Sequence, residues 1–170
     1  MKKNSLIAAL LLLAGGLAAQ NISEVWVPDL GNGKYKNPII NADYSDPDVC
    51  RVGDDYYMTS SSFNCIPALQ ILHSKDLVNW TLIGYAAERL TPEEDFSKPQ
   101  HGNGVWAPSI RYHNGEFYVC YGDPDRGIYM IKTKDPAGRW DDPILIHPAV
   151  GLIDPCPFWD EDGRAYIAHG

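Results

Sequence analysis

The sequence has no cluster of lysine and arginine, no long stretch with helical periodicity, and only four cysteines among its 170 residues. A surface that binds phosphates needs a basic patch, and the net charge here is −8, so nucleic acid is excluded as a partner. The cysteine spacing matches neither a CxxC metal site nor a dense disulfide scaffold. We therefore expect small buried thiols, with one disulfide as the alternative, at Cys50, Cys65, Cys120 and Cys156.

The first twenty residues have the layout of a secretory signal peptide. A basic "MKK" precedes the apolar run "SLIAALLLLAGGLAA", which ends in small residues before the polar "QN". The alternative is a membrane anchor, but the apolar run is shorter than the roughly 20 residues that cross a bilayer. We expect cleavage between Ala18 and Gln20, and export to the periplasm or the outside of a bacterial cell. A lead-in over 21–36 and one domain over 37–170 would remain, with no membrane association after cleavage.

Three later segments repeat one pattern. They are "DPDVCRVGDDYYMTS" from Asp46, "APSIRYHNGEFYVCY" from Ala107 and "DPCPFWDEDGRAYIAHG" from Asp154. Each begins with the residue that precedes a proline and continues through a short apolar run. A turn rich in Asp, Asn and Gly follows, and then a strand with aromatic residues. Turns with positive φ favour Asn, Asp and Gly at their centre, so each segment predicts a β-hairpin.

The similarity continues beyond the first two hairpins. "LQILHSKDLVNWTLIG" and "GIYMIKTKDPAGRWDDPIL" both contain an apolar strand, then Lys-Asp, then a tryptophan (Trp80 and Trp140), then another strand. The units begin at Pro47, Pro108 and Pro155, which lie 61 and 47 residues apart. Four-stranded units at such spacings predict an all-β fold of the β-propeller type. An all-β sandwich is the alternative. The repeated tryptophans are expected to pack between blades.

The residue before the proline is the candidate for chemistry. The first strand of a propeller blade lines the central channel, so Asp46 and Asp154 would present two carboxylates to one cavity. Ala107 takes the same place in the second unit, so the turn itself does not require aspartate. Paired carboxylates suit glycoside hydrolysis, and an inverting mechanism needs them roughly 6.5–9.5 Å apart to admit a water. Asp48 is expected to point away from Asp46 and to be structural.

Three motifs carry a family resemblance: "NPIINADYSDPDVCRVGDDYYMTSSSF", "GVWAPSIRYHNGEFYVCYGD" and "IDPCPFWDEDGRAYIAHG". In this order they resemble glycoside hydrolase family 43, which includes β-xylosidases, α-L-arabinofuranosidases and arabinanases. The resemblance runs from about Asn37 to the last residue. It implies an inverting, five-bladed β-propeller enzyme, of which this chain contains about two and a half blades.

The resemblance also implies roles for five positions. Asp46 matches the general base, and Asp154 matches the aspartate that modulates the pKa of the general acid and orients it. The side chains matching the substrate pocket are Trp106, Phe63 and Ile153. Trp106 would pack against the sugar in the innermost subsite, and Phe63 would form a pocket wall. Ile153 stands where many xylosidase-like members have phenylalanine.

The general acid of the family is a glutamate on a later blade, beyond Gly170. Glu161 is no substitute, because "DEDG" is the turn of the third hairpin, at the far end of the strand from the cavity. We therefore expect this chain to be the front portion of a longer enzyme, and to fold poorly and be inactive by itself. No cofactor is expected, although some members hold a structural calcium ion on the propeller axis.

The leading hypothesis is a glycosidase that removes terminal α-L-arabinofuranosyl or β-xylosyl residues from plant cell-wall polysaccharides such as xylan and arabinan. The alternatives are a non-catalytic carbohydrate-binding propeller and an endo-arabinanase. A binding module needs no base, so aspartate at both channel positions favours the enzyme. His101 and Asn103 follow a Gly-rich pattern beside Trp106 and are expected to lie on a solvent-exposed loop.

Overall fold

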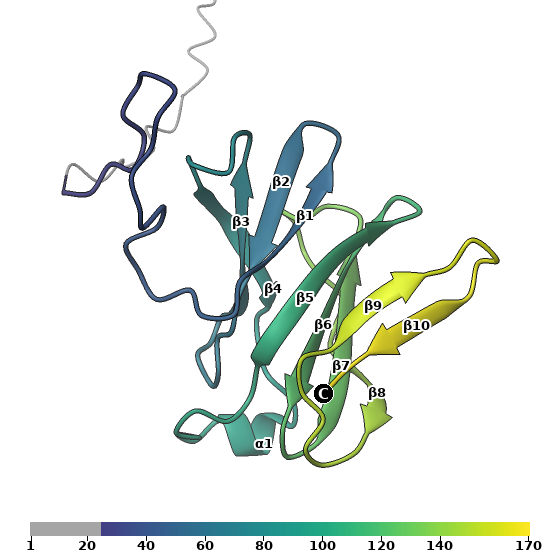
Figure 1. Ribbon diagram of the computed structural model, residues 1–170. Helices are drawn as coiled ribbons and strands as arrows, with labels where there is room; N and C mark the ends of the chain where they lie inside the picture. Colours follow the sequence, from purple (N-terminus) through teal and green to yellow (C-terminus); the bar gives the residue numbers. More distant parts are fainter. Residues whose placement is uncertain (1–24) are drawn as a thin grey trace, which may run out of the picture.

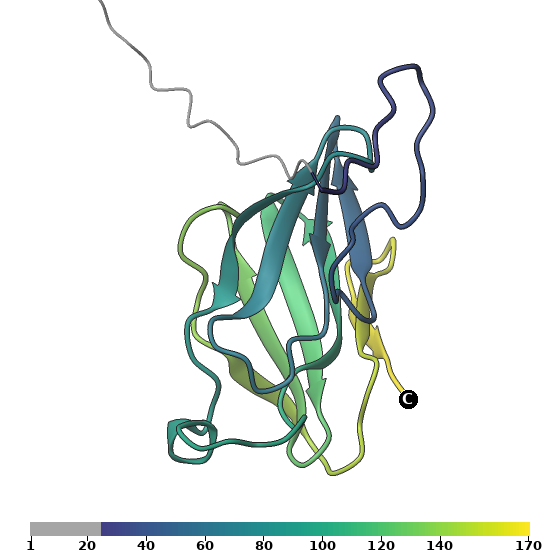
Figure 2. The same ribbon diagram turned by 90° about the vertical axis from the view of Figure 1, so that its left-hand side faces the viewer.

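The computed structural model describes residues 25–170, and Figure 1 shows their arrangement. The predicted signal peptide at 1–20 and the start of the lead-in lie outside the described residues. Among those that are described, no helix is long and apolar enough to cross a membrane. Residues 25–45 form a loop beside the first sheet, on the side away from the second, as Figure 1 and Figure 2 show.

The described residues form two four-stranded antiparallel sheets and one two-stranded sheet, with the strands of each four-stranded sheet in chain order. The first sheet contains β1 (Asp48–Val52), β2 (Asp55–Thr59), β3 (Ala68–Ser74) and β4 (Thr81–Ala87). The second contains β5 (Trp106–His113), β6 (Glu116–Asp123), β7 (Gly127–Thr133) and β8 (Ile144–Pro148). The third contains β9 (Cys156–Trp159) and β10 (Ala165–Ala168), and a single helical turn, α1 (Glu93–Phe96), lies between the first two sheets in the chain.

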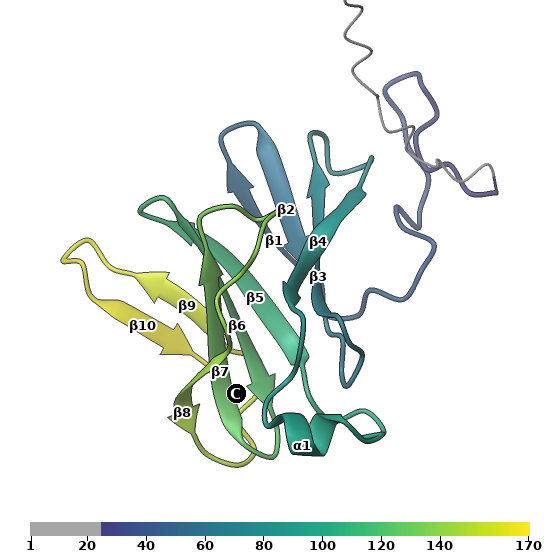
Figure 3. The same cartoon turned by 180° about the vertical axis from the view of Figure 1, so that it is seen from behind.

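The sheets are arranged as propeller blades. Strand β1 contacts β5 and β5 contacts β9, and the three run in the same direction side by side (Figure 1). Seen from behind, β4 at the outer edge of the first sheet lies near β7 of the second (Figure 3). A sandwich has only two sheets, whereas here three successive sheets each place their first strand against that of the next. The predicted all-β propeller is thus confirmed, with two complete blades and the first hairpin of a third.

The hydrophobic core lies between the first two blades. Leu69 and Ile71 of β3 pack in one cluster with Ile110 of β5 and Val119 of β6, all at 0% exposure. Trp140 is buried in the same cluster, which confirms its predicted packing between blades. Trp80 is only half-buried and lies outside this cluster, so the two tryptophans are equivalent in sequence but not in burial.

The aspartate of each repeated Lys-Asp pair stabilises the turn in which it lies. The Asp76 carboxylate accepts hydrogen bonds from the backbone N–H groups of Val78 and Asn79, at 2.9 and 2.7 Å. These bonds, the one from the Asn79 amide foremost, lower the pKa of Asp76 to about 2. Asp135 likewise accepts from the Ala137 N–H at 3.1 Å. Each aspartate therefore closes the turn between the third and fourth strands of its blade.

The cysteines only partly follow the expectation of buried thiols. All four are free; Cys120 is buried, Cys50 and Cys156 are half-buried, and Cys65 is exposed. Burial raises the pKa of Cys120 and of Cys50 to about 12, which keeps both thiols protonated at neutral pH. The expectation was wrong for Cys65, because it lies in the irregular connection between β2 and β3 rather than in a strand.

Candidate active site

The residues before the three prolines share an unusual backbone conformation. Asp46, Ala107 and Asp154 have φ values of 51°, 32° and 55°, in the left-handed region that non-glycine residues seldom adopt. A residue before proline is normally extended. Because alanine adopts this conformation in the second blade, the conformation belongs to the repeat and not to the carboxylate. Aspartate at the other two positions therefore needs another reason.

Asp46 is held by Ser61, which also links the first blade to the second. Its Oδ2 accepts a hydrogen bond from the Ser61 hydroxyl at 2.6 Å, and the Ser61 Oγ accepts one from the Ala107 backbone N–H at 2.8 Å. Ser61 is 6% exposed, whereas Asp46 is exposed to solvent. The buried hydroxyl thus fixes one carboxylate oxygen and leaves the carboxyl group accessible to water, as a general base requires.

Asp154 occupies the corresponding place at the start of β9 and is also exposed. The backbone around it is fixed from both sides. The Ser109 hydroxyl of β5 donates to the Pro155 carbonyl at 2.6 Å, and the Gly170 N–H donates to the Ile153 carbonyl at 2.8 Å. Asp46 and Asp154 thus precede β1 and β9, and these two strands lie on either side of β5 and run in the same direction (Figure 1).

The backbone pairing of Phe63 with Val105 places the two predicted aromatic residues, Phe63 and Trp106, at this end of the blades. Phe63 exchanges two hydrogen bonds with Val105, each at 3.0 Å, which join the β2–β3 connection to the residue before β5. Trp106 follows Val105, is half-buried, and donates from Nε1 to the Gly102 carbonyl at 2.7 Å. Phe63 and Trp106 are therefore both placed next to the Ser61–Ala107 link. The third predicted pocket residue, Ile153, is half-buried beside Asp154.

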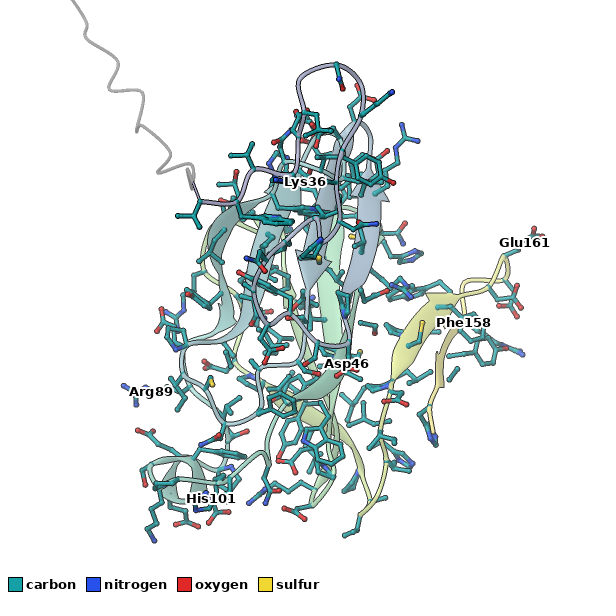
Figure 4. All side chains as sticks on the ribbon, turned by 60° about the vertical axis from the view of Figure 1, so that its left-hand side comes forward. Lys36, Asp46, Arg89, His101, Phe158 and Glu161 are labelled. Atoms are coloured by element: carbon teal, nitrogen blue, oxygen red, sulfur yellow. The ribbon has the colours of Figure 1, made fainter. Side chains whose placement is uncertain are left out.

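The loop before Trp106 differs in part from its prediction. His101 is exposed, as expected, and lies at the edge of the molecule (Figure 4). Asn103 is half-buried, and its side-chain N–H donates to the Asp125 carboxylate at 3.0 Å. Asn103 is therefore not a free surface residue, because the turn between β6 and β7 holds it.

Sequence reasoning missed Arg111, whose side chain connects all three first strands. It forms an ion pair with Asp48 of β1 and donates to the Cys156 Sγ of β9 at 2.9 Å. The Asp48 carboxylate also accepts from the Ile110 backbone N–H at 2.7 Å. This confirms the structural role predicted for Asp48. The signal in the sequence was the arginine itself, since a charged side chain on an innermost strand must find partners on its neighbours.

Replacing Arg111 with methionine is expected to lower the free energy of unfolding of the whole protein by about 1–2 kcal/mol. The reason is that Asp48, with 29% of its side chain exposed, loses its positively charged partner while remaining largely away from water. Thermal unfolding measures the change. Arg51→Met is the matched control, because Arg51 faces Asp54 at 3.7 Å with both side chains mostly exposed. Equal destabilisation by the two variants would contradict this account.

Glu161 does not belong to the site. It lies in the turn between β9 and β10, at the tip of the hairpin and well separated from Asp46 (Figure 4). This agrees with its predicted place at the far end of the strand. Within residues 25–170, no group of three or more His, Cys, Asp or Glu side chains is arranged to hold a metal ion.

The chain matches the family model described as glycosyl hydrolases family 43 over residues 35–170. It is 42% identical over 144 residues to a beta-xylosidase of Formosa agariphila, covering 82% of this chain and 24% of that protein. It is 39% identical over 163 residues to the non-reducing end alpha-L-arabinofuranosidase BoGH43B of Bacteroides ovatus, covering 91% and 29%. The chain thus spans about a quarter of the length of the curated relatives it matches.

Two solved structures resemble the fold described above. The GH43 protein BlXynB from Bacillus licheniformis superposes with a TM-score of 0.70 at 36% identity, covering 80% of this chain and 29% of that one. The Bacteroides ovatus protein GH43B superposes with a TM-score of 0.67 at 38% identity, covering 79% and 27%.

Proposed function

The chain belongs to glycosyl hydrolases family 43, and from this membership we propose that the whole protein is an exported glycosidase acting on pentose residues of plant polysaccharides. Its substrates are terminal α-L-arabinofuranosyl or β-xylosyl groups, and it inverts the configuration at the anomeric carbon. Relatives named as a beta-xylosidase and as a non-reducing end alpha-L-arabinofuranosidase support the pentose class and the exo mode.

The observation that carries the proposal is the pattern at the three blade-leading positions. Asp46 and Asp154 share their backbone conformation with Ala107, so the carboxylates are not needed for the turn. Asp46 acts as the general base: its exposed carboxylate, fixed by Ser61, activates the attacking water. Asp154 acts on the general acid, because a like charge nearby raises the pKa of an acid and keeps it protonated.

The general acid belongs to a part of the whole protein beyond the described blades. None of the glutamates of residues 25–170 stands at a blade-leading position in the sequence: Glu88, Glu93, Glu94, Glu116 and Glu161. Phe63, Trp106 and Ile153 line the sugar subsite, with the indole face of Trp106 against the C–H surface of the pentose. The proposal takes the leading peptide 1–20 as the export signal.

The test uses the whole protein with nitrophenyl α-L-arabinofuranoside, nitrophenyl β-xyloside and linear arabinan. Release of nitrophenol and of free pentose is expected, and proton NMR of the first product should show the anomer opposite to that of the substrate. Oligosaccharides released from arabinan would make the protein an endo-arabinanase instead. Binding to xylan or arabinan with no hydrolysis of any substrate would make it a carbohydrate-binding propeller and end the proposal.

A further inference from the structure

The segment between β4 and β5, residues 88–105, is called the insertion here, and it positions both aromatic residues of the proposed sugar subsite. Its last residue, Val105, pairs with Phe63, and its Gly102 carbonyl receives the Trp106 indole N–H. Gly104 packs directly on the Phe63 backbone. Any shift of the insertion therefore moves the subsite wall.

One arginine outside the insertion holds its helical turn. Arg126, in the turn between β6 and β7, forms an ion pair with Asp95 of α1. Its guanidinium group also lies over the Phe96 ring, 5.2 Å from the centroid. A planar guanidinium can do both at once, since its edge donates hydrogen bonds while its face stacks on an aromatic ring.

The Arg126 guanidinium group also pairs with a buried carboxylate of the second blade. Its Nη1 donates to the Asp123 carboxylate at 3.0 Å, and Asp123 is 1% exposed. A buried carboxylate needs a paired cation, so Arg126 has little freedom to turn away. The insertion is thereby fixed to a residue that belongs to the core of the second blade.

A second contact joins the later part of the insertion to the same turn. The Asn103 side chain donates to Asp125 at 3.0 Å, and the Gln100 side chain donates to the Asp95 carbonyl at 2.5 Å. The insertion is therefore held in its middle, at Asp95, and near its end, at Asn103, by neighbouring residues of one β-turn, Arg126 and Asp125. By contrast, Arg89 and Glu93 pair within the insertion, with 70% and 67% of their side chains exposed.

We propose that Arg126 is a positioning residue for substrate binding. It fixes the insertion against the second blade, and through it the places of Phe63 and Trp106 at the pentose subsite. Arg126 does not touch the sugar. The inference rests on the proposed function for the identity of the ligand, whereas the mechanical link from Arg126 to the insertion stands on the contacts alone.

Asp95→Ala tests this link most cleanly, because it removes the ion pair between the insertion and Arg126 and leaves the Arg126–Asp123 pair intact. We expect KM for the nitrophenyl pentoside to rise about threefold to tenfold, with kcat and the unfolding temperature nearly unchanged. Glu93→Ala is the matched control: it also removes an acidic partner of an arginine from α1, and it should leave KM unchanged. A second variant, Arg126→Met with Asp123→Asn, removes the anchor without leaving a buried charge and should raise KM similarly.

Amide hydrogen exchange of the whole protein gives a readout independent of catalysis. Exchange across residues 97–105 should accelerate about fivefold in Asp95→Ala and stay at the wild-type rate in Glu93→Ala. If the wild type hydrolyses no pentoside, the proposed function fails and the exchange data still decide on the link. Unchanged exchange in Asp95→Ala would overturn the link, and faster exchange with unchanged KM would overturn the positioning role.

Discussion

Replacing Asp46 with asparagine is expected to lower kcat of the whole protein on nitrophenyl pentosides by about 10²–10⁴-fold, the usual contribution of a general base. Asparagine tolerates the left-handed backbone at φ 51°, and its side-chain oxygen can still accept the hydrogen bond from Ser61. The variant therefore keeps the geometry and loses only the ability to take a proton from water. Steady-state kinetics measures the effect, and the unfolding temperature checks the fold.

Two companion variants make this result specific. Ser61→Ala removes the hydroxyl that holds Asp46 but leaves the base, so its loss in kcat should be about tenfold or less. Asp162→Asn changes an exposed carboxylate on the hairpin tip and should leave the rate unaltered. If kcat of Asp46→Asn stays within a factor of ten of the wild type, Asp46 is not the base.

The propeller was predictable because the turns of each blade depend on residues close together in the sequence. Each hairpin turn uses its own Asn, Asp or Gly. The Asp76 and Asp135 carboxylates likewise accept hydrogen bonds from backbone N–H groups two residues further along. The spacing of these residues therefore reveals the repeat. The equivalence of Asp46 and Asp154 followed from that repeat. Their shared left-handed conformation did not, since a residue before proline is ordinarily extended.

The contacts that fix the site were not predictable, because they depend on how whole blades meet. Arg111 reaches Asp48 across 63 residues of chain, and Arg126 reaches Asp95 across 31. No local pattern marks either pair. A charge on an innermost strand or in a turn indicates only that some partner exists. Which partner it is follows from the packing of β1 against β5 and of the insertion against the second blade.

The second large effect is expected at Gly104. Its φ is +106°, and a Cβ there would lie 2.4 Å from the Phe63 carbonyl oxygen and 3.1 Å from the Phe96 ring. Gly104→Ala must therefore strain its own backbone and also separate the Phe63–Val105 pairing. We expect the free energy of unfolding to fall by about 3 kcal/mol, the sum of backbone strain and overpacking. KM for the pentoside should rise as well, because Phe63 forms the wall of the proposed subsite.

Gly115, in the turn between β5 and β6, offers the control that separates these two causes. Its φ of +85° is also positive, but a Cβ there would meet nothing within 4 Å. Gly115→Ala should therefore cost only the backbone strain, about 1 kcal/mol, and leave KM close to the wild-type value. The difference between the two variants, measured by thermal unfolding, isolates the close approach of the insertion to Phe63. Equal destabilisation with equal KM would mean that this approach does not position the subsite wall, since the backbone conformation alone would then account for both.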